Sequence, residues 1–518
     1  MRNLNELLDE AAHSAADRVA LATQSDAVSF AELRRRTLAA AAGLRAAGIG
    51  KGDRVAIVHR NHPMFVEAYF AVVRLGAVAV PINFMIQKPA ELAYMLNDCG
   101  VKGIVTQKEF LKGLREAATL TAPAPRLWVT DGVLDDLNEG EWPFTALLSA
   151  GGEPPVVDVD EGDIASILYT SGTTGNPKGV MLTHRNFVTN CEASIERMGA
   201  GPRDVALCLL PMFHSFAWTG NVLVSLRLKI KLVIAANIAP PKPWLALMAK
   251  HGVTIFVAVP QIFSVLAKQA VGLKGMALKW WFFRKVRVAV SGAAPLNPAV
   301  LEDFQRSFGL PILEGYGLTE TTPVVSVNPP GKPKAGSVGT PIRGVRVKIV
   351  DETERELPVG EEGEICVFGD CVMKGYYNLP QATREAFTAD GWLKTGDIGA
   401  LDAEGYLFIR DRLKDMIIVK GLKVFPAQVE AVLLENPDIE EAAVIGIPDE
   451  HGDETIKAFV VLRKGSPLDK AGIMRYCREK FDPYKRPRDA ELVDSLPKNA
   501  LGKVLKRSLR ARGTAHGL

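Results

Sequence analysis

The segment from Tyr169 to His184, YTSGTTGNPKGVMLTH, combines hydroxyls, glycines and one lysine in a way that suits a polyphosphate. Glycines let the backbone approach an anion closely, and hydroxyls and backbone N–H groups donate hydrogen bonds to phosphate oxygens. A lysine adds a positive charge. We therefore expect phosphate binding by Thr170, Ser171, Gly172, Thr173, Thr174, Gly175 and Lys178.

This segment differs from the phosphate-binding loop of kinases and GTPases, which reads Gly-x-x-x-x-Gly-Lys-Ser/Thr. Counted from Gly172, that pattern places Pro177 where the second glycine is required and Gly179 where the hydroxyl residue belongs. Taken alone, the segment fits a solvated turn between a strand and a helix equally well. Other motifs must decide between the two interpretations.

The composition is that of an ordinary globular protein. The chain has 518 residues, 47% of them hydrophobic and 23% charged, and is too long for a single core. A net charge of only +3 gives no long-range field for nucleic acid, so any anion site must be local. Six scattered cysteines without a CxxC pair favour reduced thiols over disulfides or zinc.

We expect a cytoplasmic protein. The first twenty residues carry charges throughout, unlike a secretory signal. Elsewhere the sequence has no run of the about 20 apolar residues that a bilayer span requires.

Helical and strand periodicities alternate along the first part of the chain. Ser29 and Glu32 have the spacing of a capping box, which predicts a helix up to Gly48, and a buried strand follows at 53–59. The alternation continues with a helix near 64–75, the segment AVAVPI, a helix near 90–98 and the strand KGIVT. This order predicts an α/β fold with parallel sheets wrapped by helices.

The later part of the chain has a different character. Short strands with turn signals over 337–367 predict a smaller β-rich part. After it, a helix over 426–434, the strands EAAVIGI and KAFVVL, and a helix over about 469–480 predict a compact α/β unit. We place the domain boundary near Arg412, giving domains 1–411 and 412–518.

Four further segments carry groups suited to nucleotide chemistry: GYGLTE at 315–320, WLKTGDIG at 392–399, DRLKDMIIVKGLKVFP at 411–426 and LPKNALGKVLK at 496–506. With the phosphate segment, and in this order, they resemble the adenylate-forming superfamily of acyl-CoA synthetases over nearly the whole chain. EGYGLTETTPVVSVNP and GEICVFGDCVMKGYYN extend the likeness toward the long-chain fatty acyl-CoA ligase branch.

The resemblance implies an ATP-dependent fatty acid–CoA ligase with two steps. A carboxylate attacks the α-phosphate of ATP to give acyl-adenylate and pyrophosphate, and the thiol of coenzyme A then displaces AMP. Mg²⁺ is implied with ATP. Residues 1–411 would hold ATP and the acyl group, and 412–518 would form a mobile lid.

The first step brings two anions together and therefore needs a cation, for which Lys503 is the candidate. An ammonium about 4 Å from the charge, at an effective dielectric of about 20, contributes on the order of 4 kcal/mol, or about a thousandfold in rate. Without the resemblance, Lys503 would be an ordinary solvated lysine in a basic tail.

The resemblance also implies roles in nucleotide binding. Glu320 would hold Mg²⁺ and Thr319 would lie near the α-phosphate. Tyr316, between Gly315 and Gly317, would lie against adenine; Asp397 would bind the ribose hydroxyls, and Arg412 ribose or phosphate. The alternatives are a structural Asp397–Arg412 ion pair and a core position for Tyr316.

For the acyl group and the thiol, the resemblance places His214 beside the carboxylate, where we expect it to position groups and not to act as a general base. Trp218 would close an acyl tunnel or pack as a core aromatic. The expected acyl channel is lined by Phe213, Phe216, Trp218, Val259 and Val324.

In the lid, Lys414 occupies the hinge position of the family and Gly421 lies on the loop expected to line the coenzyme A tunnel. Gln428 departs from the Pro-x-Glu-Val-Glu pattern of many relatives. We expect this departure to change local lid contacts and to leave the chemistry unchanged.

The segment LKWWFFRKVR, 278–287, sets aromatic residues among cations, an arrangement that suits a membrane interface. Burial of the aromatic rings is the alternative. Peripheral contact with the inner membrane face is therefore a hypothesis.

Other functions remain open at this point. They are an aryl-CoA ligase, transfer of the acyl group to a carrier protein, and a nucleotide-binding module without catalysis. The sequence determines neither the length of the substrate's acyl chain nor whether the protein is a monomer or a homodimer.

Overall fold

The computed structural model describes residues 3–86, 88–149, 156–170, 176–270, 272–419, 422–448, 454–499 and 502–515. The chain divides into two compact units. The large unit comprises 1–346 and 367–393, and the small unit comprises 347–366 and 394–518.

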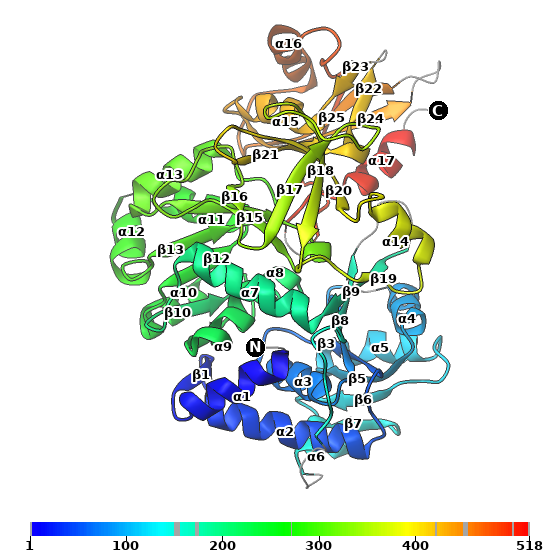
Figure 1. Cartoon of the computed structure of the whole chain (residues 1–518). Helices are drawn as coiled ribbons and strands as arrows, with labels where there is room; N and C mark the ends of the chain where they lie inside the picture. The colour runs from blue at the N-terminus through cyan, green and yellow to red at the C-terminus, as the bar shows by residue number, and fades with distance from the viewer. Residues whose placement is uncertain are drawn as a thin grey trace. The chain divides into compact units, whose positions relative to one another are not determined.

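A nine-stranded sheet dominates one half of the large unit (Figure 1), with the order β16-β15-β14-β13-β12-β10-β11-β1-β2. The six strands from β14 to β1 are parallel, and antiparallel strands extend both edges. The bounds are β1 (Val19–Ala22), β2 (Ala27–Ser29), β10 (Val205–Cys208), β11 (Lys231–Ile234), β12 (Ile255–Ala258), β13 (Val288–Ser291), β14 (Ile312–Gly317), β15 (Val324–Val327) and β16 (Thr340–Pro341).

The second sheet of the large unit has eight strands in the order β19-β9-β8-β4-β3-β5-β6-β7. Its strands are parallel from β8 to β7, while β9 and β19 are added antiparallel. The bounds are β3 (Arg54–Val58), β4 (Val78–Pro81), β5 (Val101–Thr106), β6 (Arg126–Val129), β7 (Glu141–Pro143), β8 (Ile164–Thr170), β9 (Lys178–Thr183) and β19 (Gly375–Tyr376).

Helices cover these sheets because the parallel strands are apolar runs that must be buried on both faces. They are α1 (Leu4–Ser14), α2 (Phe30–Ala46), α3 (Pro63–Arg74), α4 (Pro89–Asp98), α5 (Leu111–Ala118), α6 (Phe144–Leu148), α7 (His184–Met198), α8 (Ser215–Ala217), α9 (Val224–Leu228), α10 (Lys242–His251), α11 (Pro260–Gln269), α12 (Gly272–Ala277), α13 (Pro298–Phe308) and α14 (Pro380–Ala386). Two π-helical turns, η3 (Trp218–Leu223) and η4 (Leu278–Phe282), lie between helices of this set.

In the small unit, residues 347–366 and 394–412 form most of a four-stranded sheet, β17 (Val345–Val350)-β18 (Gly363–Gly369)-β20 (Leu393–Leu401)-β21 (Leu407–Arg412). The strands β22 (Ile417–Val419) and β23 (Leu422–Val424) form a hairpin. A third sheet, β24 (Ile439–Pro448)-β25 (Glu454–Leu462)-β26 (Asp489–Leu492), is accompanied by α15 (Pro426–Leu434), α16 (Lys470–Lys480) and α17 (Lys506–Ala515).

The structure confirms the predicted α/β class and its parallel sheets. Ser29 caps α2, since its hydroxyl accepts from the backbone N–H of Glu32 at 3.2 Å. The Glu32 carboxylate binds Arg35 and Arg36 and supplies no reciprocal cap. The segment GGEPP at 151–155, whose glycines and prolines are typical of a surface connection, lies outside the described residues.

Within the described residues, no helix is long and apolar enough to cross a membrane.

Candidate active site

Three segments of the large unit meet at the carboxyl ends of the parallel strands of the nine-stranded sheet, the edge where α/β folds bind ligands. They follow β10, β13 and β14. The Phe216 ring lies against Gly292, where an added Cβ would come within 3.0 Å of it. The Thr219 hydroxyl donates to the carbonyl of Thr322 at 3.0 Å. The expected nucleotide and acyl segments are therefore fixed to one another.

The GYG turn at the end of β14 depends on its glycines. A Cβ on Gly317 would lie 1.8 Å from the carbonyl oxygen of Pro323, and one on Gly315 would lie 3.1 Å from that of Ser326. Beyond the turn, the Thr321 hydroxyl donates to the carbonyl of Pro323 at 2.6 Å and accepts from the N–H of Leu318 at 3.0 Å. The short helix η5 (Thr319–Thr321) is thus held in place, and Thr319 and Glu320 remain half-exposed.

Tyr376 connects this turn to the predicted phosphate segment. Its hydroxyl donates to Glu320 Oε1 at 3.0 Å, and the Lys178 ammonium lies over its ring, 4.8 Å from the centroid. Burial, together with the charge of Glu320, raises the pKa of Tyr376, so the phenol keeps its proton. A cation, a phenol and a carboxylate therefore form one chain of contacts.

The predicted phosphate segment is only partly described. Thr170 ends β8 and Lys178 begins β9, and the two residues face each other across the strand pair. The Thr170 hydroxyl donates to the carbonyl of Lys178 at 3.5 Å. Ser171, Gly172, Thr173, Thr174 and Gly175 lie outside the described residues, so their predicted role stays a prediction.

His214 is placed to orient groups. Its Nδ1 accepts from the backbone N–H of Phe216 at 3.2 Å and caps α8. Burial lowers the pKa of His214 to about 4, so the ring is neutral at pH 7. With Nδ1 occupied as an acceptor, the proton resides on Nε2, which can donate to a neighbouring oxygen.

The residues expected to line an acyl channel do not share one environment. Phe213 meets Phe84 edge-on with ring centroids 5.5 Å apart and is half-buried. Trp218 is only 3% exposed and lies 4.0 Å from the Tyr69 ring, beside Phe65 on α3. The packing of Trp218 is thus that of a core aromatic, and a part in closing a tunnel stays a prediction. Val259 and Val324 are both buried at strand ends.

In the small unit, Asp397 and Arg412 face each other across β20 and β21. Arg412 Nε lies 3.2 Å from Asp397 Oδ1, and the Asp397 side chain is 5% exposed. The ion pair considered from the sequence is therefore present. Such a pair still leaves guanidinium donors and carboxylate lone pairs for a ligand.

Lys503 belongs to the same cluster. Its pKa is lowered to about 8, first by burial and then by repulsion from Arg412, while Asp397 and Asp415 oppose the shift. A turn holds it, with its N–H donating to Asn499 Oδ1 at 2.9 Å. The structure thus brings Lys503, Asp397 and Arg412 together within the small unit.

The remaining lid residues are Lys414, Gln428 and Gly421. Lys414 lies in the short helix η6 (Leu413–Asp415), directly after β21. Gln428 lies in the first turn of α15, where its N–H donates to the carbonyl of Phe425 at 3.0 Å. Gly421 is outside the described residues.

Two residues near the site were not identified from the sequence. Tyr376 stands inside the quoted segment GEICVFGDCVMKGYYN, but its contacts depend on the pairing of β19 with β9. Glu314 precedes the GYG turn and accepts from the N–H of Leu296 at 3.0 Å, and burial raises its pKa to about 7. The sequence signal that could have identified Glu314 is its position directly before the GYG turn.

Comparisons with known proteins identify the class. The family model of the AMP-binding enzyme matches residues 8–377, and that of the AMP-binding enzyme C-terminal domain matches 428–503. The chain belongs to the AMP-binding enzymes. It is an adenylate-forming acyl- or aryl-CoA ligase.

Relatives of the chain include 4-coumarate–CoA ligase 3 of Oryza sativa subsp. japonica, 36% identical, with 94% of this chain and 87% of the relative covered. They also include a long-chain-fatty-acid–CoA ligase of Escherichia coli O6:H1, 33% identical, with 99% of this chain and 95% of the relative covered.

Two solved structures are similar over nearly their whole length. One is the anthranilate CoA ligase AuaEII in complex with anthranoyl-AMP, with a TM-score of 0.90, 28% identity, and 100% and 98% of the two chains covered. The other is o-succinylbenzoate CoA synthetase of Bacillus subtilis with ATP and magnesium, with a TM-score of 0.83, 29% identity and 99% of each chain covered. ATP with Mg²⁺ and coenzyme A is therefore expected for this chain as for its family.

Proposed function

We propose that the protein joins a medium- or long-chain fatty acid to coenzyme A at the expense of ATP. A carboxylate oxygen attacks the α-phosphorus and pyrophosphate leaves, and the coenzyme A sulfur then attacks the acyl carbon, AMP leaves and the thiol proton is released. The observation that carries the proposal is the half-buried Lys503 beside Asp397 and Arg412, since a partly desolvated cation suits the meeting of two anions.

In the large unit, the proposed roles concern ATP and magnesium. A single carboxylate with phosphate oxygens suits Mg²⁺, and Glu320 keeps lone pairs for the ion while Oε1 accepts from Tyr376. When bound, the ion would neutralise phosphate charge. Thr319 would lie near the α-phosphate, Tyr316 would lie against adenine, and Lys178 would bind phosphate with the segment 170–175.

In the small unit, Asp397 would bind the ribose hydroxyls and Arg412 would donate to ribose or phosphate. We place the domain boundary at Arg412 and the hinge at Lys414, so that residues 412–518 form a lid. One face of that lid would present Lys503 for adenylation, and another would present the Gly421 loop for thioester formation.

At the carboxyl edge of the nine-stranded sheet, neutral His214 would orient the substrate carboxylate through Nε2–H. An apolar acid is supported by the types of the residues proposed to line the acyl channel, Phe213, Phe216, Val259 and Val324, none of which is charged. Charged or dicarboxylic substrates would lose solvation there without a partner.

A panel of acids tests the proposal. Pyrophosphate release is measured with saturated fatty acids from short to long chains, with benzoate and with 4-coumarate, each with and without coenzyme A. The expected result is the highest kcat/KM for medium or long chains, with thioester formed only when coenzyme A is present. Accumulation of acyl-adenylate in the presence of coenzyme A would contradict the ligase assignment and favour a carrier-protein acceptor.

The second candidate is an aromatic acid. It is favoured by the relatives named for 4-coumarate and feruloyl-CoA and by the Phe216 ring against Gly292, which occupies space that a long chain could use. Highest kcat/KM for 4-coumarate would establish this candidate. Phe216→Ala should then shift the preference toward longer acids, and Phe263→Ala, which removes a buried ring of α11, serves as its control for general loosening.

We further propose that the protein contacts a membrane only peripherally and acts as a monomer or homodimer. Long-chain acids partition into bilayers, so an enzyme that meets them at the surface gains access to its substrate. Support comes from the exposure of Trp280 and Trp281, because the alternative interpretation of this segment was that its aromatic rings are buried.

A further inference from the structure

One stretch of the large unit is basic without any acidic residue. From Val205 to Leu301 the sequence contains eleven lysines and arginines and no aspartate or glutamate. The whole chain is nearly balanced, with 62 basic and 59 acidic residues, so this stretch is distinct. It contains β10, β11, β12 and β13, and several of its cations lie where these strands begin.

Because these strands are parallel, their amino ends share one edge of the nine-stranded sheet, opposite the candidate active site. At this edge, Arg18, Arg203 and Lys231 line a cavity of about 470 Å³. Asp204 also lines the cavity, and its carboxylate is bound by Arg287, which directly precedes β13. The guanidinium of Arg287 therefore neutralises the carboxylate of Asp204. Cations are present at the amino ends of strands from β1 to β13 along this edge.

Farther along the same edge, the side chain of Lys285 lies against Gly252, before β12; a Cβ added there would be 3.1 Å from the lysine Nζ. Lys279 and Arg284 line a second cavity, of about 210 Å³, with Val286 and Leu310, which precede β13 and β14. We call this surface the basic-aromatic edge. Its members are Arg18, Arg203, Lys231, Lys279, Arg284 and Lys285, together with Trp280 and Trp281.

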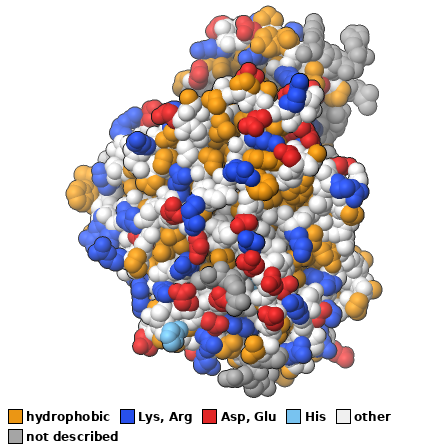
Figure 2. Space-filling model, viewed as in Figure 1, with side chains coloured by type: hydrophobic (Ala, Val, Ile, Leu, Met, Phe, Trp, Pro, Cys, Tyr) orange, Lys and Arg blue, Asp and Glu red, His pale blue; other side chains and the backbone are white. Residues whose placement is uncertain are grey.

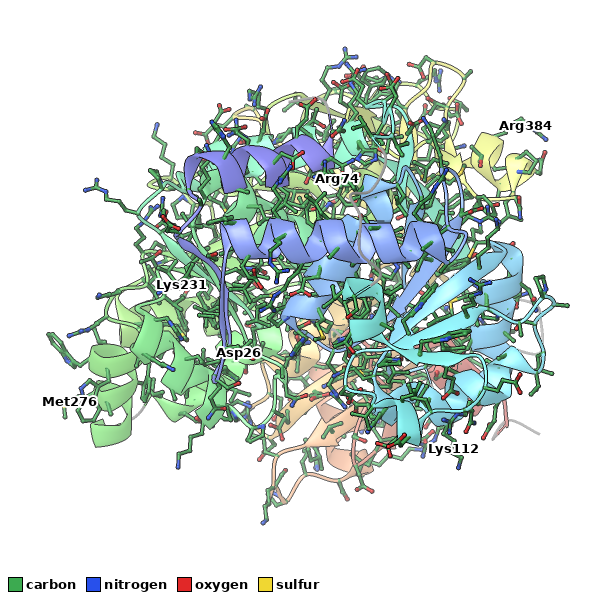
Figure 3. The ribbon with its side chains drawn as sticks, turned by 90° about the horizontal axis from the view of Figure 1, so that it is seen from below. Asp26, Arg74, Lys112, Lys231, Met276 and Arg384 are labelled. Atoms are coloured by element: carbon green, nitrogen blue, oxygen red, sulfur yellow. The ribbon has the colours of Figure 1, made fainter. Side chains whose placement is uncertain are left out.

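The tryptophans belong to the π-helical turn η4. Trp280 is 68% exposed and Trp281 is 71% exposed, and Met276 on α12 is 52% exposed. Figure 2 shows Lys and Arg side chains beside a hydrophobic protrusion at the left margin, where Figure 1 labels α12. In Figure 3, Met276 and Lys231 are on the same side of the view and Lys112 is on the other.

The exposed turn has a rigid base. Phe283, directly after η4, is 5% exposed and packs against Phe256 and Phe308 with ring centroids 5.3 Å and 4.7 Å apart. The two tryptophans are therefore held outward by a packed neighbour. An exposed pair of tryptophans costs hydration free energy unless another apolar phase covers it.

We propose that the basic-aromatic edge docks on the surface of an anionic lipid bilayer. Trp280 and Trp281 would enter the interface, the level at which tryptophan is enriched in membrane proteins, and nearby cations would approach lipid phosphates. Among the described residues, none forms an ion pair with Lys279, Arg284 or Lys285. The two large apolar rings and Met276 favour a bilayer over nucleic acid, for which phosphate contacts would suffice.

This inference rests on the peripheral contact proposed above, but not on the identity of the acid. It adds an orientation: the bilayer meets the amino ends of the parallel strands, and the candidate active site lies at the opposite edge of the same sheet. Docking therefore leaves the GYG turn and the His214 segment of the large unit at the edge away from the bilayer.

Vesicle co-sedimentation of the full chain, without ATP or coenzyme A, tests the proposal. We expect binding to mixed phosphatidylcholine–phosphatidylglycerol vesicles that falls at high salt, and weak binding to pure phosphatidylcholine. Each cation near an anionic surface contributes roughly fivefold, so Arg284→Glu with Lys285→Glu should weaken partitioning more than about 25-fold. Trp280→Ser with Trp281→Ser should weaken it at least about tenfold.

Matched controls lie elsewhere on the large unit. Trp142, 37% exposed on β7, gives the control Trp142→Ser. Exposed Lys88 and Lys112 give the charge control Lys88→Glu with Lys112→Glu. Both controls should bind vesicles as the unaltered protein does, and lipids brominated near the headgroup should quench fluorescence in them but much less in the Trp280→Ser, Trp281→Ser variant.

Vesicle binding unaffected by the paired tryptophan change would overturn the proposal, as would equal binding to neutral and anionic vesicles. Tighter binding to RNA than to anionic vesicles, lost in the charge variant and kept in the tryptophan variant, would overturn it in favour of a nucleic-acid surface. Pyrophosphate release measured in the same samples separates the two claims. Intact vesicle binding without any ligase activity would refute the proposed function alone.

Discussion

The hydroxyl of Tyr376 donates to Oε1 of Glu320 across 3.0 Å, joining residues 56 positions apart. The same ring lies under the Lys178 ammonium at 4.8 Å. Tyr376 therefore connects the carboxylate proposed for magnesium with the lysine proposed for phosphate. A phenol that keeps its proton fixes the carboxylate without adding charge.

Tyr376→Phe should remove the hydrogen bond and keep the ring beneath Lys178. A hydrogen bond to a charged group contributes about 1.5–3 kcal/mol, so pyrophosphate release at low Mg·ATP should fall about tenfold to a hundredfold. Titration of ATP and magnesium locates the loss in KM. Tyr377→Phe is the neighbouring control and should retain activity; equal activity of the two variants would refute a role for the Tyr376 hydroxyl.

Lys503→Ala should separate the two half-reactions. Loss of a cation beside the reacting anions should slow adenylation about a thousandfold, while supplied acyl-adenylate should still give the thioester. Both steps are followed by pyrophosphate release and by thioester formation. Lys498→Ala is the control, because that ammonium is bound to Glu441 at 2.6 Å. Equal losses in both steps would contradict a lysine dedicated to adenylation.

The pH dependence of adenylation should reflect the same lysine. With a pKa of about 8, the ammonium fraction falls from about nine-tenths at pH 7 to about one-tenth at pH 9, and adenylation at low ATP should fall in parallel. Folding stability should change in the opposite direction. The unfolded chain holds this proton up to about pH 10.5. Between about pH 8 and pH 10.5 the penalty that the ammonium places on folding is therefore relieved, and the free energy of unfolding rises.

The control for this profile is Lys503→Arg, whose charge does not titrate in the range. Its residual adenylation should lack the decline near pH 8. A decline of the same midpoint in that variant would assign the titration to another group.

The sequence predicted much of the fold because helical and strand periodicities alternate along it. The helix expected at 426–434 coincides with α15, and the apolar runs before the motifs are parallel strands. Motifs that follow such strands reach one edge of a sheet, so the clustering of the GYG turn with the His214 segment follows from topology.

Other features required tertiary information. Tyr376 reaches Glu320 because β19 pairs with β9, a register that the local sequence does not specify. The exposure of Trp280 and Trp281 depends on which aromatic residue fills the core, and Phe283 does so. An aromatic run alone does not show which of its rings is buried.

Gly317→Ala should disrupt the turn that carries Thr319 and Glu320. Its Cβ would lie 1.8 Å from the carbonyl of Pro323, so backbone must move, at a cost of about 2–4 kcal/mol in unfolding free energy. Adenylation should fall with it. Gly201→Ala is the control, since nothing lies within 4 Å of its added methyl group, and thermal unfolding should be nearly unchanged. Full activity of Gly317→Ala would refute the constraint.

The segment that carries Lys503 is anchored three residues later. Lys506 Nζ lies 2.8 Å from Glu430 Oε1, which also accepts from the N–H of Val444 at 2.8 Å, and the Glu430 side chain is 20% exposed. Glu430→Gln should leave Lys506 without its counter-charge, cost about 2 kcal/mol in denaturant unfolding, and slow adenylation more than thioester formation from supplied acyl-adenylate. Adding Lys506→Met should recover part of the stability, because it removes the unpaired ammonium, while Asp411 loses a neighbouring cation. Adenylation should stay low in that double variant, since the ion pair that anchors the Lys503 segment is absent. Recovery of both the unfolding free energy and the adenylation rate would show that the pair contributes only to folding.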